Sequence, residues 1–394
     1  MKVLQFVTRL DLGGAQETCL DQCRFLLERG HEVHLLSGAE GELVDDARGM
    51  SGLTLHLWPE WQHPVRPLRD ARCFLRLVGL LRRERFDLLH THSSKSGIFG
   101  RLAARLARTP RLAVHHVHGW SFNRTQPRPV RALYILLERM AARPGFLLLS
   151  CSHETDAQGR RAGIGRDEDR RVVRYGIDRR PNLRYRDRDA IRRRLGLGRR
   201  ELLFLQLGNL KSQKDPLTFA RAAVLAGKNR NRLQFWIAGD GPLRAEAQKI
   251  ASDGGLDDRF RVLGWRRDVP DLLEAADVLV LTSRFEGLPI AILRGMAAGR
   301  PVVATAVDGT PEAVEHGKSG LLVQPGDVQG IAEALESLTT DASARRRMGR
   351  AARNRSALFT SHRATMETLA VYGLPAGSAG ANRVLKKSAL ADQE

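Results

Sequence analysis

The sequence is poor in cysteine. Its 394 residues include four, Cys19, Cys23, Cys73 and Cys151, and their spacing is not that of a metal site. Cys19 and Cys23 are four residues apart on an expected helix, where we expect small buried hydrophobic side chains. This pattern excludes a disulfide-rich secreted domain and favours a reduced, intracellular protein.

Long apolar runs are missing as well. No run reaches the roughly 20 residues that a membrane-spanning helix needs. The opening MKVLQFV resembles a short strand and is followed by Arg9 and Asp11, so we expect neither a signal peptide nor an anchor there. We expect a cytoplasmic protein that contacts a membrane, if at all, as a peripheral protein on the cytoplasmic face of the inner membrane.

Acidic residues are outnumbered by basic ones. The 64 Lys and Arg residues against 44 Asp and Glu residues give a formal net charge of +20. This indicates a polyanionic partner (nucleic acid, a phosphate-rich substrate or an anionic membrane), or else an arginine-rich coding bias. Residues 101–150 hold nine arginines and a single acid, Glu138, among apolar residues. This fits contact with anionic lipid, or simply a solvated helix face. No nucleic-acid recognition motif is present, so we expect no nucleic-acid partner.

Short apolar runs alternate with helical patterns along the chain. The expected strands form two series, one at 2–8, 31–37, 53–58, 86–92 and 111–118, the other at 202–208, 233–239, 260–265, 277–282, 301–305 and 320–324. Such alternation predicts parallel, doubly wound α/β sheets. We therefore expect two Rossmann-like domains, at 1–180 and 181–373, followed by a disordered tail at 374–394.

Glycines and polar residues gather where these strands end. In open parallel sheets, ligands bind beyond the carboxyl ends of the strands, so these positions predict two sites that face each other across a cleft. The positions are Gly13–Gly14, His90–Ser93, His118–Gly119, Gly208–Asn209 with Lys214, Gly239–Gly241, Gly264–Trp265, Glu286–Gly287 and Asp308–Gly309.

Several of these residues allow two interpretations. Gly13 and Gly14 form either a tight turn or a backbone that phosphate can approach closely. Lys214 stands at a helix start, against the dipole preference, which a bound anion would explain; otherwise it is an exposed loop lysine. His90 with His92, and His116 with His118, have spacings that a metal site could use, but neither carboxylate nor cysteine completes a set. We therefore expect no metal, and expect His118 to form hydrogen bonds at the cleft.

The segment 284–301, RFEGLPIAILRGMAAGRP, combines a strand end, a turn and an apolar helix. Glu286 can accept hydrogen bonds from two neighbouring hydroxyl groups, which suits a sugar ring. Gly287, Leu288 and Pro289 lead into the helix, where unpaired N–H groups can bind hydroxyl or phosphate oxygens. Arg294 lies further along, and helical side chains lean toward the N-terminus, so it can point back toward a ligand there.

These motifs, in this order, resemble the family 4 retaining glycosyltransferases of GT-B fold over nearly the whole chain. The segments that carry the resemblance are TRLDLGGAQE, LLHTHSSKSGIFGRLAARLA, VHHVHGWSF, LGNLKSQKDPLTFARAA, WIAGDGPLR, FRVLGWRRDVPDLL, TSRFEGLPIAILRGMAAGRPVVAT and EHGKSGLLVQPGD.

The resemblance implies an acceptor-binding first domain and a second domain that binds a nucleotide-sugar donor, UDP- or GDP-linked, without a metal. It also implies that the last helix packs back on the first domain. The acceptor would be a lipid-linked or surface polysaccharide, and the anomeric configuration would be retained.

The resemblance also implies roles for individual residues. Gly13 and Gly14 would offer backbone to the donor phosphates, and Gly208 and Asn209 would belong to the phosphate-binding segment. His118 would contact the donor sugar near the reacting carbon. Lys214 would neutralise the diphosphate, and Glu286 with the backbone of Gly287, Leu288 and Pro289 would hold the sugar hydroxyls.

Two positions depart from the family pattern. Arg294 replaces a glutamate that binds the ribose hydroxyls, and Asn209 stands where an arginine is common. Arg294 could pair with Glu286 or another acid, contact phosphate in place of the charge missing at 209, or mark a decayed site. A non-catalytic or weakly active homologue that acts as a binding protein is therefore the alternative to an enzyme. Trp265 and Arg266 lie either near the base or, for Trp265, in the core.

Overall fold

The computed structural model describes residues 1–109, 112–142, 145–180, 186–228 and 230–374. The chain forms two compact units, one of Met1–Arg174 with the segment from Arg363 onward, the other of Tyr175–His362. The first unit ends its N-terminal part at residue 174, where the sequence predicted a domain boundary at 180, and the second unit ends at 362, where the sequence predicted 373. The C-terminal helix α16 (Ser361–Val371) belongs mostly to the first unit. Apart from Leu374, the tail expected at 374–394 lies outside the described residues.

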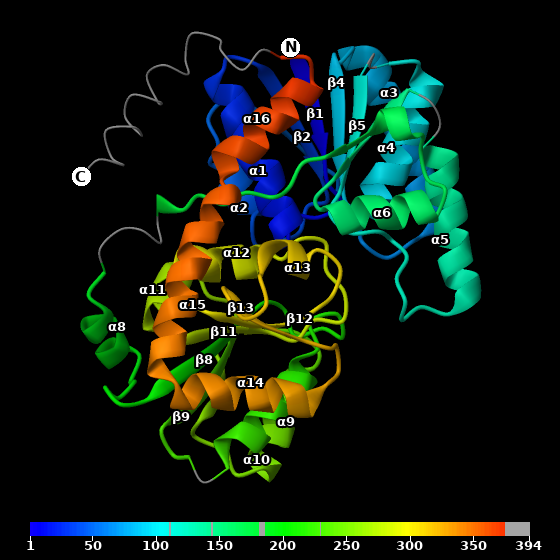
Figure 1. The fold of residues 1–394 in the computed structure, drawn as a ribbon. Helices are drawn as coiled ribbons and strands as arrows, with labels where there is room; N and C mark the ends of the chain where they lie inside the picture. The colour runs from blue at the N-terminus through cyan, green and yellow to red at the C-terminus, as the bar shows by residue number, and fades with distance from the viewer. Residues whose placement is uncertain (110–111, 143–144, 181–185, 229, 375–394) are drawn as a thin grey trace. The chain divides into compact units, whose positions relative to one another are not determined.

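The first unit is built on a seven-stranded sheet in the order β3-β2-β1-β4-β5-β6-β7, and every neighbouring pair is parallel (Figure 1). Its strands are β1 (Lys2–Phe6), β2 (Glu32–Ser37), β3 (Leu53–Leu57), β4 (Leu88–His92), β5 (Leu112–Val117), β6 (Phe146–Ser150) and β7 (Arg170–Val172). Its helices are α1 (Gly14–Glu28), α2 (Val44–Arg48), α3 (Pro67–Glu84), α4 (Ser94–Ala107), α5 (Arg128–Ala141) and α6 (His153–Arg161), with the short turn η1 (Asp167–Asp169).

Alternate residues of these strands supply two cores, one on each face of the sheet. Val3 packs with Cys19 and Cys23 of α1, whereas the next residue, Leu4, packs with Leu77 of α3 on the other face. This is the period of two that a strand buried on both faces requires. The α16 segment joins the first of these cores through Leu369 and Tyr372. The expected packing of the last helix on the first domain therefore rests on buried apolar surface.

The second unit is built on a six-stranded parallel sheet in the order β10-β9-β8-β11-β12-β13. Its strands are β8 (Leu202–Leu207), β9 (Leu233–Ala238), β10 (Phe260–Val262), β11 (Val278–Leu281), β12 (Val302–Thr305) and β13 (Gly320–Val323). Its helices are α8 (Arg188–Arg194), α9 (Pro216–Gly227), α10 (Arg244–Asp253), α11 (Val269–Ala275), α12 (Ile290–Ala297), α13 (Thr310–Ala313), α14 (Val328–Thr340) and α15 (Ala342–Arg355), with the short turn η2 (Ser356–Leu358).

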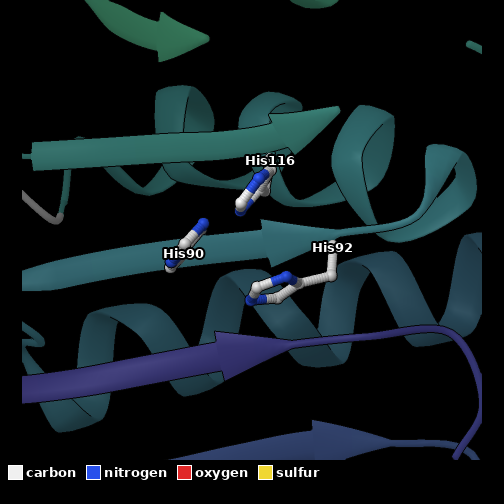
Figure 2. Close-up of side chains that lie close together, drawn as sticks. All are labelled: His90, His92 and His116. Carbon is white, nitrogen blue, oxygen red and sulfur yellow. The ribbon is translucent and has the colours of Figure 1, made fainter. Parts of the chain in front are cut away.

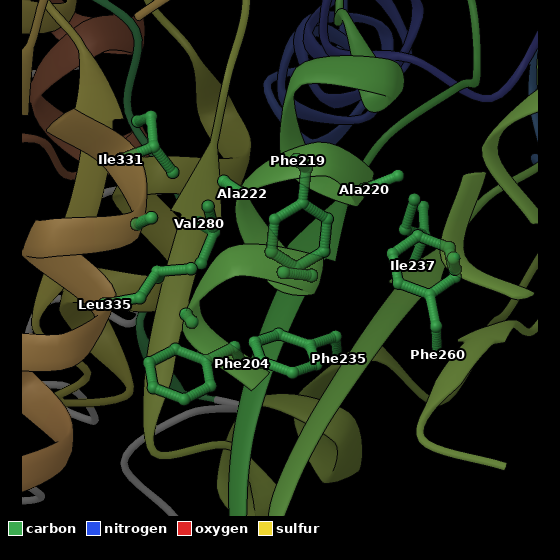
Figure 3. Packing of buried hydrophobic residues seen from close by; sticks show 14 of the residues in the cluster. Phe204, Phe219, Ala220, Ala222, Phe235, Ile237, Phe260, Val280, Ile331 and Leu335 are labelled. Carbon is green, nitrogen blue, oxygen red and sulfur yellow. The ribbon is translucent and has the colours of Figure 1, made fainter. Parts of the chain in front are cut away.

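A cluster of aromatic rings forms one core of the second unit (Figure 3). Phe204 of β8 stacks on Phe235 of β9 with ring centroids 5.5 Å apart, and Phe219 of α9 meets the edge of Phe235 at 6.2 Å. Such offset and edge-to-face pairs are the favoured arrangements of aromatic rings. They fix α9 on the sheet, and α9 begins directly after the loop that carries Lys214.

The two sheets confirm the expected α/β class with two Rossmann-like domains, and all eleven expected strands are present. The sequence interpretation missed β6 and β7. The run FLLLS of β6 directly follows the basic segment 128–144, and we read the two together as one amphipathic surface. Among the described residues, no helix combines the length and apolar character needed to span a bilayer.

The basic stretch 101–150 is also not one continuous surface. It comprises the end of α4, β5, α5 and β6, and its only acid is buried. Glu138 and Arg101 are 1% and 0% exposed, and Arg101 Nη2 donates to Glu138 Oε2 at 2.5 Å. Ser121 Oγ also donates to Glu138, at 3.2 Å, and Arg101 Nε donates to the Gly97 carbonyl. This charge pair ties α4 to α5 inside the first unit.

We predict that Glu138→Ala destabilises the protein by about 3–5 kcal/mol, because it leaves the Arg101 guanidinium buried without its counter-charge. Asp45→Ala is the matched control, since Asp45 pairs with Arg48 at the surface, where an ion pair is worth about 0–1 kcal/mol. Chemical denaturation of the two variants measures both effects. Equal stabilities for the two variants would contradict the assignment.

Candidate active site

The first glycine pair lies between β1 and α1. Gly13 is the N-cap of α1 in an extended conformation, with φ of −174°, and Gly14 is the first helical residue. A side chain at Gly13 would meet only the end of the flexible Gln16 side chain, at 2.9 Å from Oε1. The backbone conformation and packing of the described residues therefore do not by themselves require glycine at 13. A ligand that approaches the start of α1 closely would require it.

His118 follows β5, is half-buried and belongs to a hydrogen-bonded chain. Its Nε2 lies 2.9 Å from Nδ1 of His92, and Nε2 of His92 lies 2.7 Å from Oε1 of Gln5. An amide oxygen only accepts, so His92 carries its proton on Nε2 and accepts at Nδ1 from His118 Nε2–H. The buried residues Gln5 and His92 thus fix the tautomer and the orientation of His118.

Three further histidines lie beside this chain, His90, His115 and His116, and they are buried as His92 is. Burial lowers the pKa of each of them and of His118, and neighbouring imidazoles lower most of these pKa values further. For His116, burial alone lowers the pKa to about 3. His118 is therefore neutral at pH 7, so at that pH it can act as a hydrogen-bonding group but not as a cation.

In the second unit, two loops at the carboxyl edge of the sheet are tied together. The loop after β8 ends at Asp215, and the loop after β11 begins at Thr282. Thr282 Oγ1 donates to the Asp215 carbonyl at 2.8 Å, and Arg284 Nε donates to the Asp215 carboxylate at 3.0 Å. The Arg284 N–H also donates to the Gln213 carbonyl at 2.8 Å. These bonds place Lys214 beside the strand end that carries Glu286.

Lys214 and Glu286 form an ion pair there. Lys214 Nζ lies 2.5 Å from Glu286 Oε1, with side chains 16% and 6% exposed. Ser283 Oγ donates to the same carboxylate oxygen at 2.6 Å, and the Glu286 N–H donates to Asp308 Oδ2 at 2.7 Å. The pair thus joins a cation suited to phosphate with an acceptor suited to hydroxyl groups. Sequence reasoning missed Ser283, although it is a polar residue at a strand end like the others.

Gly208 and Asn209 lie at the start of the same loop. Gly208 has φ of +143°, which glycine adopts most readily, and its carbonyl oxygen would lie 1.9 Å from a side chain at Gly239. The two loop backbones therefore meet closely at Gly239, which has no room for a side chain, whereas Gly208 is favoured by its backbone conformation. Asn209 Oδ1 is buried and has no hydrogen-bond partner among the described residues. Such an acceptor is costly unless a ligand donates to it.

The turn after Glu286 is buried at Gly287, Leu288 and Pro289, and Pro289 is the N-cap of α12. Proline has no N–H, so within this turn only Gly287 and Leu288 can donate backbone hydrogen bonds to a ligand. Arg294 is half-buried and lies only about one turn into α12, because the helix begins at Ile290. The sequence left open whether Arg294 pairs with Glu286. The structure shows that Glu286 forms an ion pair with Lys214.

The remaining candidates divide as follows. Trp265 is 43% exposed, which excludes the core-packing interpretation. Arg266 pairs with Asp268 at 2.6 Å. The residues predicted for the site thus form two groups, Gly13, Gly14 and His118 at the carboxyl edge of the first sheet, and the others at the carboxyl edge of the second.

Two family models match the chain. Residues 187–355 match the model described as glycosyl transferases group 1, and residues 12–180 match the model described as glycosyltransferase family 4. A UDP-Gal:α-D-GlcNAc-diphosphoundecaprenol α-1,3-galactosyltransferase of Escherichia coli is 32% identical over 336 residues, which cover 84% of this chain and 86% of that protein. A D-inositol 3-phosphate glycosyltransferase of Streptomyces avermitilis is 32% identical over 309 residues, covering 73% and 65%.

The fold is also found among solved structures. The crystal structure of Anabaena HepE in complex with UDP and glucose has a TM-score of 0.81 and 22% sequence identity, and the match covers 95% of this chain and 99% of that one. The structure of WaaG, a glycosyltransferase involved in lipopolysaccharide biosynthesis, has a TM-score of 0.76 and 19% identity, covering 92% and 98%. These TM-scores show that the two-domain fold is shared, and at such identities the likeness shows the fold alone.

The buried histidines predict acid sensitivity of the first unit. Their pKa values are lower in the folded state than the unfolded value of about 6.5, so the unfolded state binds more protons below that pH. Stability is therefore fully present above about pH 6.5 and falls as the pH drops, by up to about 1.4 kcal/mol per pH unit for each histidine.

Thermal unfolding followed between pH 8 and 4 tests this. We expect the unfolding temperature of the first unit to fall before that of the second, which contains only His316 and His362. Hydrogen exchange assigns the transition to a unit. Loss of stability that begins only below about pH 5, where carboxylates titrate, would show that the histidines make no such contribution.

Proposed function

This chain belongs to the group 1, family 4 glycosyltransferases, and on that premise we propose that it transfers a sugar from a UDP- or GDP-linked donor to a lipid-linked or surface polysaccharide acceptor, with retention of the anomeric configuration. The observation that carries the proposal is the Lys214–Glu286 pair at the carboxyl edge of the second sheet. UDP is favoured as the nucleoside diphosphate because the E. coli relative is named for UDP-Gal. That relative also acts on a diphosphoundecaprenol-linked sugar, which favours a lipid-linked acceptor.

The proposed reaction is a glycosyl transfer in which charged and polar residues of the second unit stabilise the leaving diphosphate and bind the sugar. The bond between the anomeric carbon and the donor diphosphate breaks, and the acceptor oxygen forms a bond to that carbon. The acceptor hydroxyl proton passes to the leaving phosphate, so no protein nucleophile and no metal enters the proposed step. Lys214 stabilises the charge that develops on the leaving diphosphate, while Glu286 and the turn N–H groups of Gly287 and Leu288 hold the sugar hydroxyls. Gly208, with Asn209 Oδ1, would border the donor in the same loop.

In this proposal the first unit supplies the acceptor side and part of the donor site. Gly13 and Gly14 leave the start of α1 open to the donor phosphates, and His118 contacts the transferred sugar near its reacting carbon. Since His118 is held neutral and oriented by His92, it binds the sugar by hydrogen bonding and adds no charge to the site. Arg294, on the helix that follows the sugar-binding turn, adds positive charge beside the phosphates.

We also propose that the outer face of α5 rests on an anionic membrane. Val130, Leu133, Leu136 and Met140 are each 41–55% exposed and, being three or four residues apart, form one stripe. Exposed arginines at 124, 128 and 131 lie at the start of the same segment. An apolar stripe beside arginines is the arrangement of a peripheral helix on anionic lipid headgroups. It would hold the first unit close to a lipid-linked acceptor.

We predict that Lys214→Ala lowers kcat about 10²–10³-fold, because the site loses the cation that stabilises the leaving diphosphate. Release of UDP or GDP from a panel of nucleotide sugars, with a sugar-diphospholipid acceptor, measures turnover. Lys249→Ala is the matched control, since Lys249 is 73% exposed and pairs with Asp253 on α10. Thermal unfolding of both variants separates lost catalysis from lost folding.

Three outcomes of this assay distinguish the alternatives. Wild-type turnover in Lys214→Ala would exclude the proposed role of the pair. No turnover by the wild type with any donor would favour the non-catalytic homologue that Arg294 and Asn209 suggest. If the wild type is inactive, Arg294→Glu, which restores the family residue, should raise turnover. If the wild type is active, loss of turnover in Arg294→Glu would show that Arg294 takes part in donor binding.

For the membrane face, we predict that Leu133→Ser/Leu136→Ser weakens binding to phosphatidylglycerol vesicles about tenfold or more, since two large apolar side chains no longer enter the interface. Vesicle flotation measures the bound fraction. Leu225→Ser on α9, which is 48% exposed in the second unit, is the control and should bind as the wild type does. Equal flotation of all three proteins, or no preference for anionic over neutral vesicles, would contradict the placement.

A further inference from the structure

Three histidines of the first sheet lie on the same side of two neighbouring strands. His92 of β4 is paired in register with His116 of β5, and His90 precedes His92 by two residues, so all three side chains leave the same face. At least one ring nitrogen from each lies within 4.8 Å of the others. Figure 2 shows the rings of His90 and His92 on β4 and of His116 on the neighbouring strand β5. Sequence spacing revealed only pairs, because the set of three requires two strands to be neighbours.

This cluster is buried and incompletely hydrogen-bonded. His90, His92 and His116 are 0%, 0% and 1% exposed. His90 Nδ1 lies 2.5 Å from the Tyr372 hydroxyl, whereas His90 Nε2 has no hydrogen-bond partner among the described residues. A buried polar atom in this state carries a desolvation cost of about 1–3 kcal/mol. It points to a ligand that accepts an electron pair from imidazole nitrogen.

We propose that His90, His92 and His116 form a binding site for a transition-metal dication of the Zn²⁺ class. Imidazole nitrogen suits Zn²⁺, Cu²⁺ and Ni²⁺, whereas Mg²⁺ and Ca²⁺ require oxygen ligands, which this set does not supply. Three histidines leave the fourth position of a tetrahedral ion for a water molecule. His90 Nε2 is the ligand atom that needs no existing hydrogen bond to be broken.

The geometry requires only a modest adjustment. Nitrogen ligands about 2.0–2.1 Å from Zn²⁺ are roughly 3.4 Å apart in a tetrahedral site, so ring nitrogens now within 4.8 Å of one another must close by up to about 1.4 Å. Rotation of the imidazoles on the strands can supply that movement. The Tyr372 hydroxyl already orients His90 through its other nitrogen, as partners of metal-binding histidines commonly do.

Metal binding would also affect the neighbouring hydrogen-bonded chain. Both ring nitrogens of His92 are engaged, one with Gln5 and one with His118. An ion that takes one of these nitrogens replaces one of the two bonds. Occupancy of the site is therefore coupled to how His118 is held, although binding itself does not depend on the proposed transferase activity.

Isothermal titration of the full chain with ZnCl₂, after removal of bound metal by EDTA and of EDTA by desalting, tests the site. We expect one Zn²⁺ per chain at pH 7 and no comparable binding of MgCl₂. His90→Gln should weaken this binding by about 100-fold or more, since loss even of an outer partner of a metal ligand costs 10–100-fold. His153→Gln, which changes an exposed histidine of the same unit, should bind Zn²⁺ as the wild type does.

X-ray absorption at the zinc edge keeps the test independent of how the variants fold. The wild-type protein with one equivalent of Zn²⁺ should show three imidazole nitrogens at about 2.0–2.1 Å. No Zn²⁺ binding, a shell dominated by oxygen, or equal affinity of a folded His90→Gln variant would each overturn the proposal. Thermal unfolding without metal establishes whether that variant is folded.

Discussion

Two parallel strands can be neighbours only if the chain crosses back over one face of the sheet, so every strand ends at the same edge. Both units of this protein obey that constraint in all of their strand pairs. It brings residues from distant parts of the sequence together at one edge. Lys214 and Glu286 are 72 positions apart, and His92 and His118 are 26 apart, yet each pair is in direct contact. The buried cores on the faces of the sheets keep these edges in place.

The two edges differ in electrostatic character. The second sheet presents a lysine and a carboxylate that compensate each other within a nearly buried site, together with Asn209 Oδ1, an acceptor that has no hydrogen-bond partner in the described part of the chain. The first sheet presents neutral imidazoles whose pKa values are lowered by burial. One edge is suited to a charged diphosphate, and the other to hydrogen bonding with a neutral sugar or to binding a metal cation by nitrogen.

Much of this could be predicted from the sequence, because strand periodicity and strand-end residues are local signals. All eleven expected strands exist, and Glu286 and Lys214 follow carboxyl strand ends as expected, whereas their direct contact depends on β8 and β11 being neighbours, which the structure reveals. The buried Arg101–Glu138 pair could not be predicted, since its charges look like any solvated helix face until α4 and α5 pack. The three-histidine cluster likewise depends on which strands are neighbours. Strand β6 was not recognised because its apolar run follows a basic amphipathic segment.

The central claim is that the loops after β8 and β11 together bind a nucleotide sugar. Hydrogen exchange of the full chain, with and without saturating UDP and in parallel GDP, tests it most directly. The account predicts slower exchange with one of the two nucleotides in residues 208–215 and 283–292, and little change in the amides of α10 and α14. Unchanged exchange in both loops with either nucleotide would contradict it.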